Sequence, residues 1–516
     1  MADLSNKDRE GARLYHEVTK HSYTSVRSNP HRLDWDNRPF QYKIYPAAGS
    51  LAMPRELELP SMATAAAIAG RVGTTRGGDR TVGLEEITRL LFCTGGLTRS
   101  RTVDGEEYHF RAAASAGALY PIEIYLAAGD VDGVERGLYH FSPADLKLRG
   151  LRRGDWRGYL AEAAARDDLR QSRAILIFSA IFWRSAWKYR ARAYRYCFWD
   201  AGTMLANLLA VASADEILAE IITFFADTPV ERLLDVDGDR EGLVSLVALG
   251  RVPDAPAAPF GATSPPPIGL DTLPLSAHEV VYDDLVKMHR ASRLDSPGAA
   301  VEFRGARLPP TIGSGGGVSV MLEPLGDGET AELGVTILRR GSTREFAREA
   351  IDGGELATIL ATATAPIPGD LPLMVEPFLI VNAIDGLDAG VYRFRRATGK
   401  LELLRAGEFR GEAGYLCLEQ PLGSDCSALI CYMTRLDDIL EAFGNRAYRM
   451  AHLEAGVLGG RAYLAAYSTG RGATGLTFYD DDASKFFSPN DPAWSPLLML
   501  AVGAPQRRVN RDPDDD

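Results

Sequence analysis

The chain has 516 residues, of which 46% are hydrophobic and 24% are charged. At about 100–200 residues per domain, this length predicts two to four domains and excludes a single small module. Lys and Arg number 57 against 69 Asp and Glu, which gives a formal net charge of −12 at pH 7. This acidic balance argues against general nucleic-acid binding, which needs a basic surface to neutralise phosphates.

The cysteines and the N-terminus bear on the cellular location. Five cysteines show no paired spacing of the zinc or redox type, and we interpret them as reduced core thiols: Cys93, Cys197, Cys417, Cys426 and Cys431. Residues 1–10 are polar, without the apolar segment of a signal peptide or a lipidation motif. No apolar run reaches the roughly eighteen residues of a membrane span. These features predict a cytoplasmic protein that binds no membrane.

Composition divides the chain into five parts. Residues 1–65, rich in His, Asn, Pro and Tyr, show no sustained period and are expected to form an extended arm that wraps a domain. Residues 66–252 and 308–510 are expected to form two domains, the second opening with the soft segment 308–317. Between them, residues 253–307 supply a proline-rich linker and a connecting helix. Residues 511–516 form an acidic tail that is expected to be disordered.

Apolar periodicity predicts the elements of each domain. Helices are expected at 83–93, 196–213 and 448–468, and strands at 122–127, 174–178, 377–381 and 427–432. Strands of this kind bury both faces only when helices cover them. The pattern therefore predicts an α+β fold in each half.

The two halves carry the same landmarks in the same order. Arg340–Arg344 (RGSTR) corresponds to Arg76–Arg80 (RGGDR), and a strand followed by Gly-x-Tyr at 376–394 corresponds to the same pattern at 123–141. Tyr-Arg followed by a short acidic-Ala-Gly segment occurs at both 194–202 and 448–456. We therefore predict a tandem duplication, equivalent to a homodimer fused into one chain with a pseudo-twofold axis between its halves.

The second half carries the candidate phosphate ligands. Arg340, Ser342 and Arg344 place two guanidinium groups and a hydroxyl within one or two turns, a donor set for charge-assisted hydrogen bonds to a phosphate. Taken alone, such a segment is more often a solvated basic patch. Further along the chain, a glycine-rich turn could approach a flat ligand and a late basic pair adds charge: Gly472, Thr474, Gly475, Arg507 and Arg508.

The first half carries a different set of candidates. A loop of small residues, suited to close contact with an aromatic ring system, precedes the first strand: Ser115, Ala116, Gly117, Ala118 and Leu119. A simple turn is the competing interpretation. Lys188 and Tyr189 lie in an aromatic stretch, where partial desolvation would lower the pKa of the lysine toward that of a general base. An ordinary surface lysine with its stem on aromatic rings is the alternative.

The order of these motifs resembles the SagB/ThcOx-type dehydrogenases, a group within the FMN-dependent nitroreductase superfamily. The resemblance spans nearly the whole chain and is carried by residues 15–20 (YHEVTK), 115–121 (SAGALYP), 188–189 (KY) and 194–202. It implies FMN at an interface between two nitroreductase-like units, with phosphate ligands from Arg-x-Ser-x-Arg and a late basic residue of one unit. The small-residue loop of the other unit would face the ring.

The resemblance also implies an activity, the oxidation of peptide thiazolines or oxazolines to thiazoles or oxazoles in ribosomally made natural products. Lys188 and Tyr189 match the catalytic pair of the family, and molecular oxygen would reoxidise the flavin. Which of the two residues is the base stays open at this point. A modified peptide is the implied substrate, and a cyclodehydratase complex is a candidate partner.

The halves differ where a cofactor would bind. Arg76–Arg80 lacks the serine, and residues 217–227 lack the glycines of 472–475. The second half has Pro366–Pro372 in place of the small-residue loop and Phe443-Gly444-Asn445 in place of Lys-Tyr. Because each half keeps what the other lacks, we predict one composite FMN site per chain.

Three other functions remain compatible with these residues. The first is an NAD(P)H-dependent nitro- or quinone reductase, and the second is an oxidase of a carrier-tethered, non-ribosomal substrate. The third is a flavin-binding protein without catalytic activity, since a fold does not fix a function.

Overall fold

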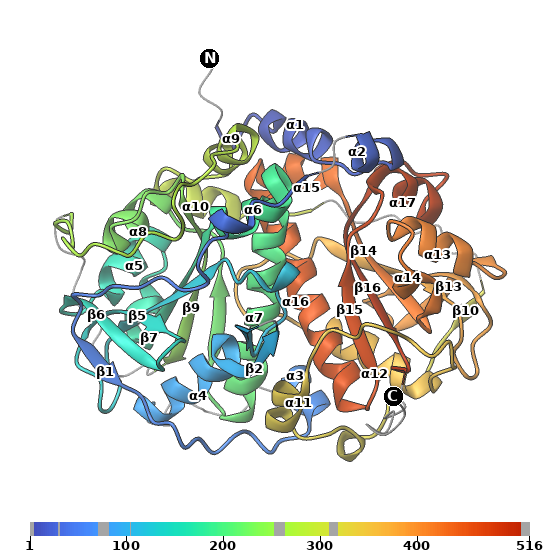
Figure 1. The fold of residues 1–516 in the computed structure, drawn as a ribbon, viewed down its shortest axis with the longest axis horizontal. Coiled ribbons are helices and arrows are strands. Elements are labelled where there is room, and N and C mark those ends of the chain that lie inside the picture. The colour runs from blue at the N-terminus through green and yellow to red at the C-terminus, as the bar shows by residue number, and fades with distance from the viewer. Residues whose placement is uncertain are drawn as a thin grey trace.

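Two seven-stranded antiparallel sheets form the body of the protein, as seen in a computed structural model (Figure 1). The structure describes residues 5–28, 31–70, 82–103, 105–251, 264–308 and 318–506. Figure 1 shows the first sheet and its helices in blue to green on the left and the second in yellow to red on the right. Arg76–Arg80, residues 309–317, Arg507, Arg508 and the acidic tail lie outside the described residues.

The first sheet has the strand order β1-β6-β5-β4-β7-β9-β8. Its strands are β1 (Ser50–Ala52), β4 (Ile122–Ala128), β5 (Gly137–Ser142), β6 (Lys147–Arg153), β7 (Ser172–Ile181), β8 (Ala219–Ile222) and β9 (Glu241–Arg251). The helices of this half are α3 (Thr64–Ala69), α4 (Leu84–Gly95), α5 (Arg157–Ala164), α6 (Phe182–Tyr189), α7 (Ala193–Ala214) and α8 (Asp227–Leu234). A separate hairpin pairs β2 (Leu97–Val103) with β3 (Glu106–Arg111).

The second sheet has the matching order β10-β13-β12-β11-β14-β16-β15. Its strands are β10 (Ser319–Val320), β11 (Val375–Val381), β12 (Gly390–Arg395), β13 (Lys400–Ala406), β14 (Ala428–Arg435), β15 (Gly472–Leu476) and β16 (Trp494–Gly503). The helices of this half are α11 (Leu333–Arg339), α12 (Gly353–Ala363), α13 (Arg410–Leu416), α14 (Pro421–Asp425), α15 (Leu436–Phe443), α16 (Arg446–Ser468) and α17 (Asp480–Phe487). Each strand therefore has a counterpart at the same place in the other sheet.

The predicted elements are present within a few residues of their expected bounds. The predicted helices are α4, α7 and α16, and the predicted strands are β4, β7, β11 and β14. The N-terminal arm is not wholly extended, because it forms α1 (Glu10–Val18), α2 (Tyr23–Ser28) and the edge strand β1. Of the linker, residues 264–282 contain no helix or strand, and α9 (Asp283–Ala291) and α10 (Pro297–Arg304) follow.

Helices α7 and α16 cross in close contact at the centre of the molecule (Figure 1). A Cβ atom added at Gly456 would lie 2.5 Å from the carbonyl oxygen of Trp199, and one added at Gly202 would lie 2.5 Å from the carbonyl oxygen of Leu453. Gly460 meets Thr203 and Ala206 in the same way. The missing side chains thus let the two backbones touch.

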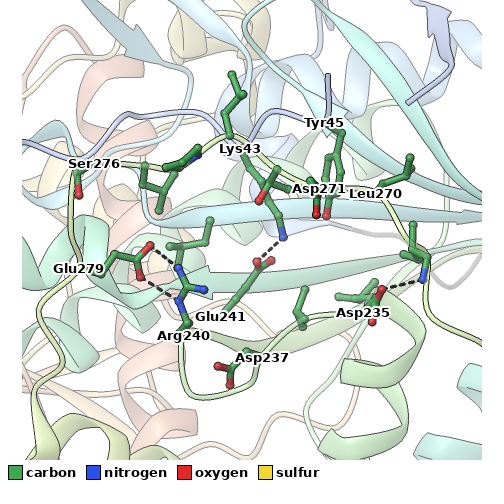
Figure 2. Close-up of a pocket in the computed structure, with 18 of the residues that line it drawn as sticks. Lys43, Tyr45, Asp235, Asp237, Arg240, Glu241, Leu270, Asp271, Ser276 and Glu279 are labelled. Atoms are coloured by element: carbon green, nitrogen blue, oxygen red, sulfur yellow. Dashed lines mark hydrogen bonds and ion pairs between the residues drawn. The ribbon is translucent and has the colours of Figure 1, made fainter. Parts of the chain in front are cut away.

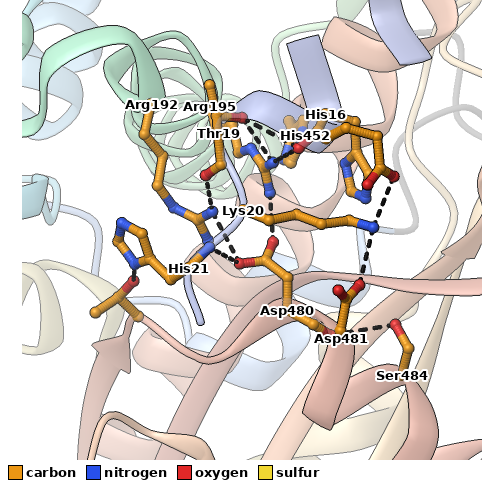
Figure 3. A network of polar contacts seen from close by, with 12 residues as sticks. His16, Thr19, Lys20, His21, Arg192, Arg195, His452, Asp480, Asp481 and Ser484 are labelled. Carbon is orange, nitrogen blue, oxygen red and sulfur yellow. Dashed lines mark hydrogen bonds and ion pairs between the residues drawn. The ribbon is translucent and has the colours of Figure 1, made fainter. Parts of the chain in front are cut away.

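Two buried ion-pair clusters connect the halves reciprocally. Arg192 and Arg195, at the start of α7, donate to the carboxylate of Asp480 at 2.9 and 2.7 Å (Figure 3). Arg446 and Arg449, at the start of α16, donate to Asp227 at 2.6 and 2.7 Å. Burial would raise the pKa of both aspartates, but the paired guanidinium groups lower it below the usual range.

The helical stretch Phe182–Ala214 is long and apolar enough to cross a membrane by length and composition. From the sequence we predict a helix over residues 196–213 of this stretch and no apolar run as long as a membrane span. Within this protein, 89% of its most apolar window is buried. Together with its contact with α16, this burial makes it a core helix of the structure. All five cysteines are free and buried, as predicted.

We expect Gly456→Ala to lower the free energy of unfolding by about 1–3 kcal/mol, because the new methyl group would force the two helix backbones apart. Thermal or urea unfolding measures this change. Gly411→Ala is the matched control, since a Cβ at this helical position meets nothing within 4 Å. Equal stability of the two variants would contradict the close crossing.

Candidate functional site

The small-residue loop after β3 is held by a buried aspartate. Ser115 Oγ donates to the carboxylate of Asp200 on α7 at 2.5 Å, and the backbone N–H of Ala116 donates to the other oxygen at 2.9 Å. The backbone N–H of Tyr120 donates to Ser115 Oγ at 2.9 Å. Gly117 has a φ of 65° and Ala118 a φ of 53°, so the loop turns tightly at its tip.

Among the residues that the structure describes, no Lys, Arg or His forms an ion pair with the carboxyl group of Asp200. Burial raises its pKa to about 7, although the hydrogen bonds from Ser115 and Ala116 act in the opposite direction. Asp200 therefore changes its charge near neutral pH while it holds the loop.

Lys188 and Tyr189 lie directly over the tip of this loop, at the end of α6. A Cβ added at Gly117 would lie 2.8 Å from the Tyr189 hydroxyl and 3.2 Å from Lys188 Nζ. Burial lowers the pKa of Lys188, and the charges of Arg344 and Arg38 lower it further. Burial raises the pKa of Tyr189, whose ring packs against Tyr196 at 4.3 Å. Burial therefore acts against the charged form of both side chains.

The segment 340–344, which follows α11 in the second half, contacts the first half next to the small-residue loop. Arg340 is buried, and its guanidinium donates to the carbonyl oxygens of Arg111 at 2.9 Å and Ala112 at 3.0 Å in the first half. The backbone N–H of Thr343 donates to the carbonyl oxygen of Ala473 at 2.9 Å, which fixes this segment against β15.

The hydroxyl of Tyr463 on α16 lies between the segment 340–344 and strand β15. It lies 3.4 Å from Ser342 Oγ and accepts a hydrogen bond from the backbone N–H of Gly475 at 2.6 Å. Arg99 on β2 adds another cation, since it donates to the carbonyl oxygen of Arg340 at 3.3 Å.

Several positive charges converge at this place, where the two halves meet. Among the residues that the structure describes, no ion pair with a carboxylate is formed by any member of the set Arg99, Lys188, Arg340 and Arg344. Arg99 lowers the pKa of Arg340, after the larger effect of burial, and Arg344 does the same to Lys188. Like charges held together in this way favour an anionic ligand.

The structure therefore joins most of the predicted site residues. The loop 115–118, Lys188, Tyr189, the 340–344 segment and Gly472–Gly475 meet where the two halves touch. Thr474 and Leu119 are buried at 3% and 4% exposure. Arg507 and Arg508 lie outside the described residues.

Sequence reasoning missed four residues of the candidate site, of which Tyr467 lies 3.3 Å from Thr343 through the two hydroxyl oxygens. The spacing of Tyr463 and Tyr467 puts both on one helix face, which is a detectable signal. Arg99 contacts a residue 241 positions away and gives no local signal. Asp200 served only as a landmark of the repeat.

The corresponding place on the other side of the molecule is filled by the protein itself. By sheet register, Ile221 on β8 occupies the position that Gly475 holds on β15. Its backbone N–H donates to the carbonyl oxygen of Pro368 at 2.9 Å, and its carbonyl oxygen accepts from the N–H of Asp370 at 3.0 Å. A Cβ at Gly369 would lie 1.9 Å from that carbonyl oxygen, whereas one at Gly475 would meet only the Tyr463 hydroxyl at 3.7 Å.

Side chains lock this second loop in place. The Asp370 carboxylate accepts from the backbone N–H and hydroxyl of Thr223 at 2.6 and 2.9 Å and pairs with Arg304 at 3.1 Å. Arg461, which replaces Asn207 at the corresponding position of the long helix, donates to the carbonyl oxygens of Ala365 and Pro366. The segment 366–372 therefore covers the edge of β8 at Ile221, and we call this segment the plug.

A cavity of about 750 Å³ lies elsewhere, between the arm and residues 268–281 (Figure 2). Two ion pairs lie among the residues that line it. Lys43 donates to Glu241 at 2.5 Å, and Arg240 pairs with Glu279 at 2.7 Å. These pairs fasten the arm and the linker to the end of the first sheet.

Comparison with known proteins identifies the domain type. Residues 78–251 match the nitroreductase family. The chain contains a nitroreductase-family domain. A solved structure of a candidate nitroreductase from Anabaena variabilis is 26% identical, with a TM-score of 0.75 over 96% of this chain and 99% of that chain. The nitroreductase-like α+β fold thus extends over both halves.

Two curated relatives match parts of the chain. A candidate nitroreductase of Methanocaldococcus jannaschii is 28% identical over 169 residues, which cover 33% of this chain and 80% of that protein. The microcin B17-processing protein McbC of Escherichia coli is 26% identical over 133 residues, which cover 25% of this chain. The match spans about half the length of McbC, namely 49%.

We expect the pH dependence of stability to show the unusual pKa of Asp200. An aspartate ionises near pH 4 in the unfolded chain but at about 7 in the native protein, so its contribution to stability falls as pH rises between these values. Asp200→Asn should remove this decline, which amounts to roughly 4 kcal/mol across the window. Urea unfolding of both proteins at several pH values measures the difference, and parallel profiles would contradict the assignment.

Proposed function

We propose that this protein is an FMN-dependent oxidoreductase that oxidises thiazoline or oxazoline rings in peptides to thiazoles or oxazoles. The observation that carries the proposal is the convergence of unpaired cations with the loop below Lys188 and Tyr189. Similarity to the processing protein McbC supports a peptide substrate, and similarity to nitroreductases supports a flavin.

The donor set suits the phosphate of FMN. Arg344 and Ser342, with Arg99 and Arg340 beside them, offer guanidinium and hydroxyl donors where no carboxylate of the described residues competes. Gly475 leaves space at the edge of β15, and Gly117, which has no side chain, lets the tip of the loop lie against Lys188 and Tyr189. A flat ring system would lie between these two backbone surfaces.

One FMN per chain is supported by the plug at segment 366–372. In a fused homodimer, each half would form the same ion pairs with the other, and the same helix of each half would meet at the twofold axis. The reciprocal Arg–Asp pairs and the contact of Gly202 with Gly456 fit this arrangement. We therefore extend the proposal to a tandem duplication in which the chain is its own pseudo-dimer. Of the two interfacial sites of such a dimer, one is open and the other is closed by Asp370, Thr223 and Ile221.

Aromatisation of an azoline ring removes two electrons and two hydrogens. When bound, FMN supplies the two-electron acceptor. Lys188 Nζ, favoured as a neutral amine by burial and by Arg344, takes the proton that leaves the ring. The Tyr189 hydroxyl keeps its proton and donates a hydrogen bond to the substrate. Asp200 keeps the loop in position through Ser115 and Ala116.

The proposal includes a terminal oxidant, a cellular location and a partner enzyme. Molecular oxygen is the terminal oxidant, the location is cytoplasmic, and a cyclodehydratase that forms azolines from Cys or Ser side chains is the partner that supplies the substrate. An NAD(P)H-dependent nitro- or quinone reductase is the second candidate, favoured by the match to nitroreductases. Rapid bleaching of the bound flavin by NADPH, without turnover of a thiazoline peptide, would decide for this second candidate.

The purified protein is expected to be yellow and to release close to one FMN per chain. Arg344→Ala should weaken FMN binding by about tenfold to a hundredfold, the usual worth of an Arg–phosphate contact. Arg348→Ala, which removes an exposed arginine paired with Asp425, is the control and should bind FMN normally. Flavin absorbance after denaturation and equilibrium titration measure both quantities. Two flavins per chain would contradict the prediction that the plug closes the second site.

Lys188→Ala should slow the oxidation of a synthetic thiazoline peptide by about 10²–10⁴-fold while FMN stays bound. Tyr189→Phe should slow it less, because the phenol orients the ring and does not take the proton. Mass spectrometry of the loss of two hydrogens measures turnover, and flavin occupancy is measured alongside. Lys287→Ala, an exposed lysine on α9, is the control. Full turnover by the double variant would exclude both residues from the chemistry.

A further inference from the structure

The arm brings exposed aromatic side chains to the rim of the site. Trp35 is 62% exposed and Phe40 is 48% exposed. Large aromatic side chains normally bury most of their surface, so a pair of them close to a site calls for a partner. Both lie on one short segment of the arm, residues 34–41.

Three contacts connect this segment to the catalytic pair. The Trp35 ring packs edge-on against Trp187 at 5.2 Å, and Trp187 precedes Lys188 in α6. Trp187 Nε1 donates to the carbonyl oxygen of Asp34 at 2.8 Å. Gln41 Nε2 donates to the carbonyl oxygen of Ala118 at 2.8 Å, at the tip of the loop below Lys188.

Arg38 lies between the arm and the β2–β3 hairpin. Its guanidinium carbon is 5.9 Å from the Trp35 ring centroid and 5.3 Å from that of Tyr108 on β3. Its charge also lowers the pKa of Lys188. We call Trp35, Arg38 and Phe40 the arm shelf.

We infer that the arm shelf binds the peptide segment next to the reacting ring and prefers an aromatic side chain there. The inference rests on the proposed function, because it assigns the substrate class of the same site. An indole face and a guanidinium plane both stack favourably on aromatic rings. The shelf is continuous with the site through Trp187 and Gln41, so a peptide whose ring lies under Lys188 extends over it. A small nitroaromatic or quinone would not reach it.

The test measures binding separately from turnover. The probes are two fluorescein-labelled pentapeptides that contain a thiazole, one with Phe and one with Gly before the ring. Fluorescence anisotropy with the FMN-loaded full chain is expected to show about tenfold tighter binding of the Phe peptide. Trp35→Ala, Arg38→Ala and Phe40→Ala should each reduce this preference, and Trp35→Phe should restore part of it.

Tyr23→Ala is the matched control, because Tyr23 is a similarly exposed aromatic residue of the arm that packs on Tyr479 instead. This variant should keep the full preference for the Phe peptide. Equal binding of the two peptides by the wild-type protein, or the same loss in Tyr23→Ala, would overturn the inference. Failure to oxidise a thiazoline peptide, with the Phe preference intact, would overturn the proposed chemistry and leave the shelf in place.

Discussion

The close crossing of α7 and α16 is the constraint on which the rest of the structure depends. Gly202 and Gly456 let the two backbones touch, so the central helix of one half lies directly against that of the other. Two arginines at the start of each helix then reach into the opposite half, where one carboxylate, of Asp480 or of Asp227, accepts hydrogen bonds from both. Buried charges of this kind tolerate little displacement, because losing one partner leaves the other unpaired.

This crossing also assembles the site. Asp200 lies two residues before Gly202, and from there it holds the loop at Ser115 and Ala116. Tyr463 lies seven residues after Gly456 and orders Gly475. The same two helices that join the halves thus position the first-half loop and the second-half strand edge toward each other.

The two sides of the molecule then differ for local reasons. On one side glycine at 475 leaves the strand edge open, and on the other Ile221 pairs its backbone with Pro368 and Asp370. Replacement of Asn207 by Arg461 at the corresponding helix position reinforces the closed side, since the longer side chain reaches the plug. The two sheets therefore have the same strand order, but the edge at Gly475 is open and the edge at Ile221 is covered.

The sequence by itself determined the α+β class of the fold, the position of the long helices and the segments that meet where the two halves touch. These features depend on local periodicity and on short motifs such as 115–121 and 340–344. Only the tertiary structure decided that the Arg340 guanidinium donates hydrogen bonds to the carbonyl oxygens of Arg111 and Ala112. The same holds for the hydrogen bond that Arg99 donates to the carbonyl oxygen of Arg340. Contacts between residues more than 200 positions apart leave no periodic trace, because they depend on how the two helices cross.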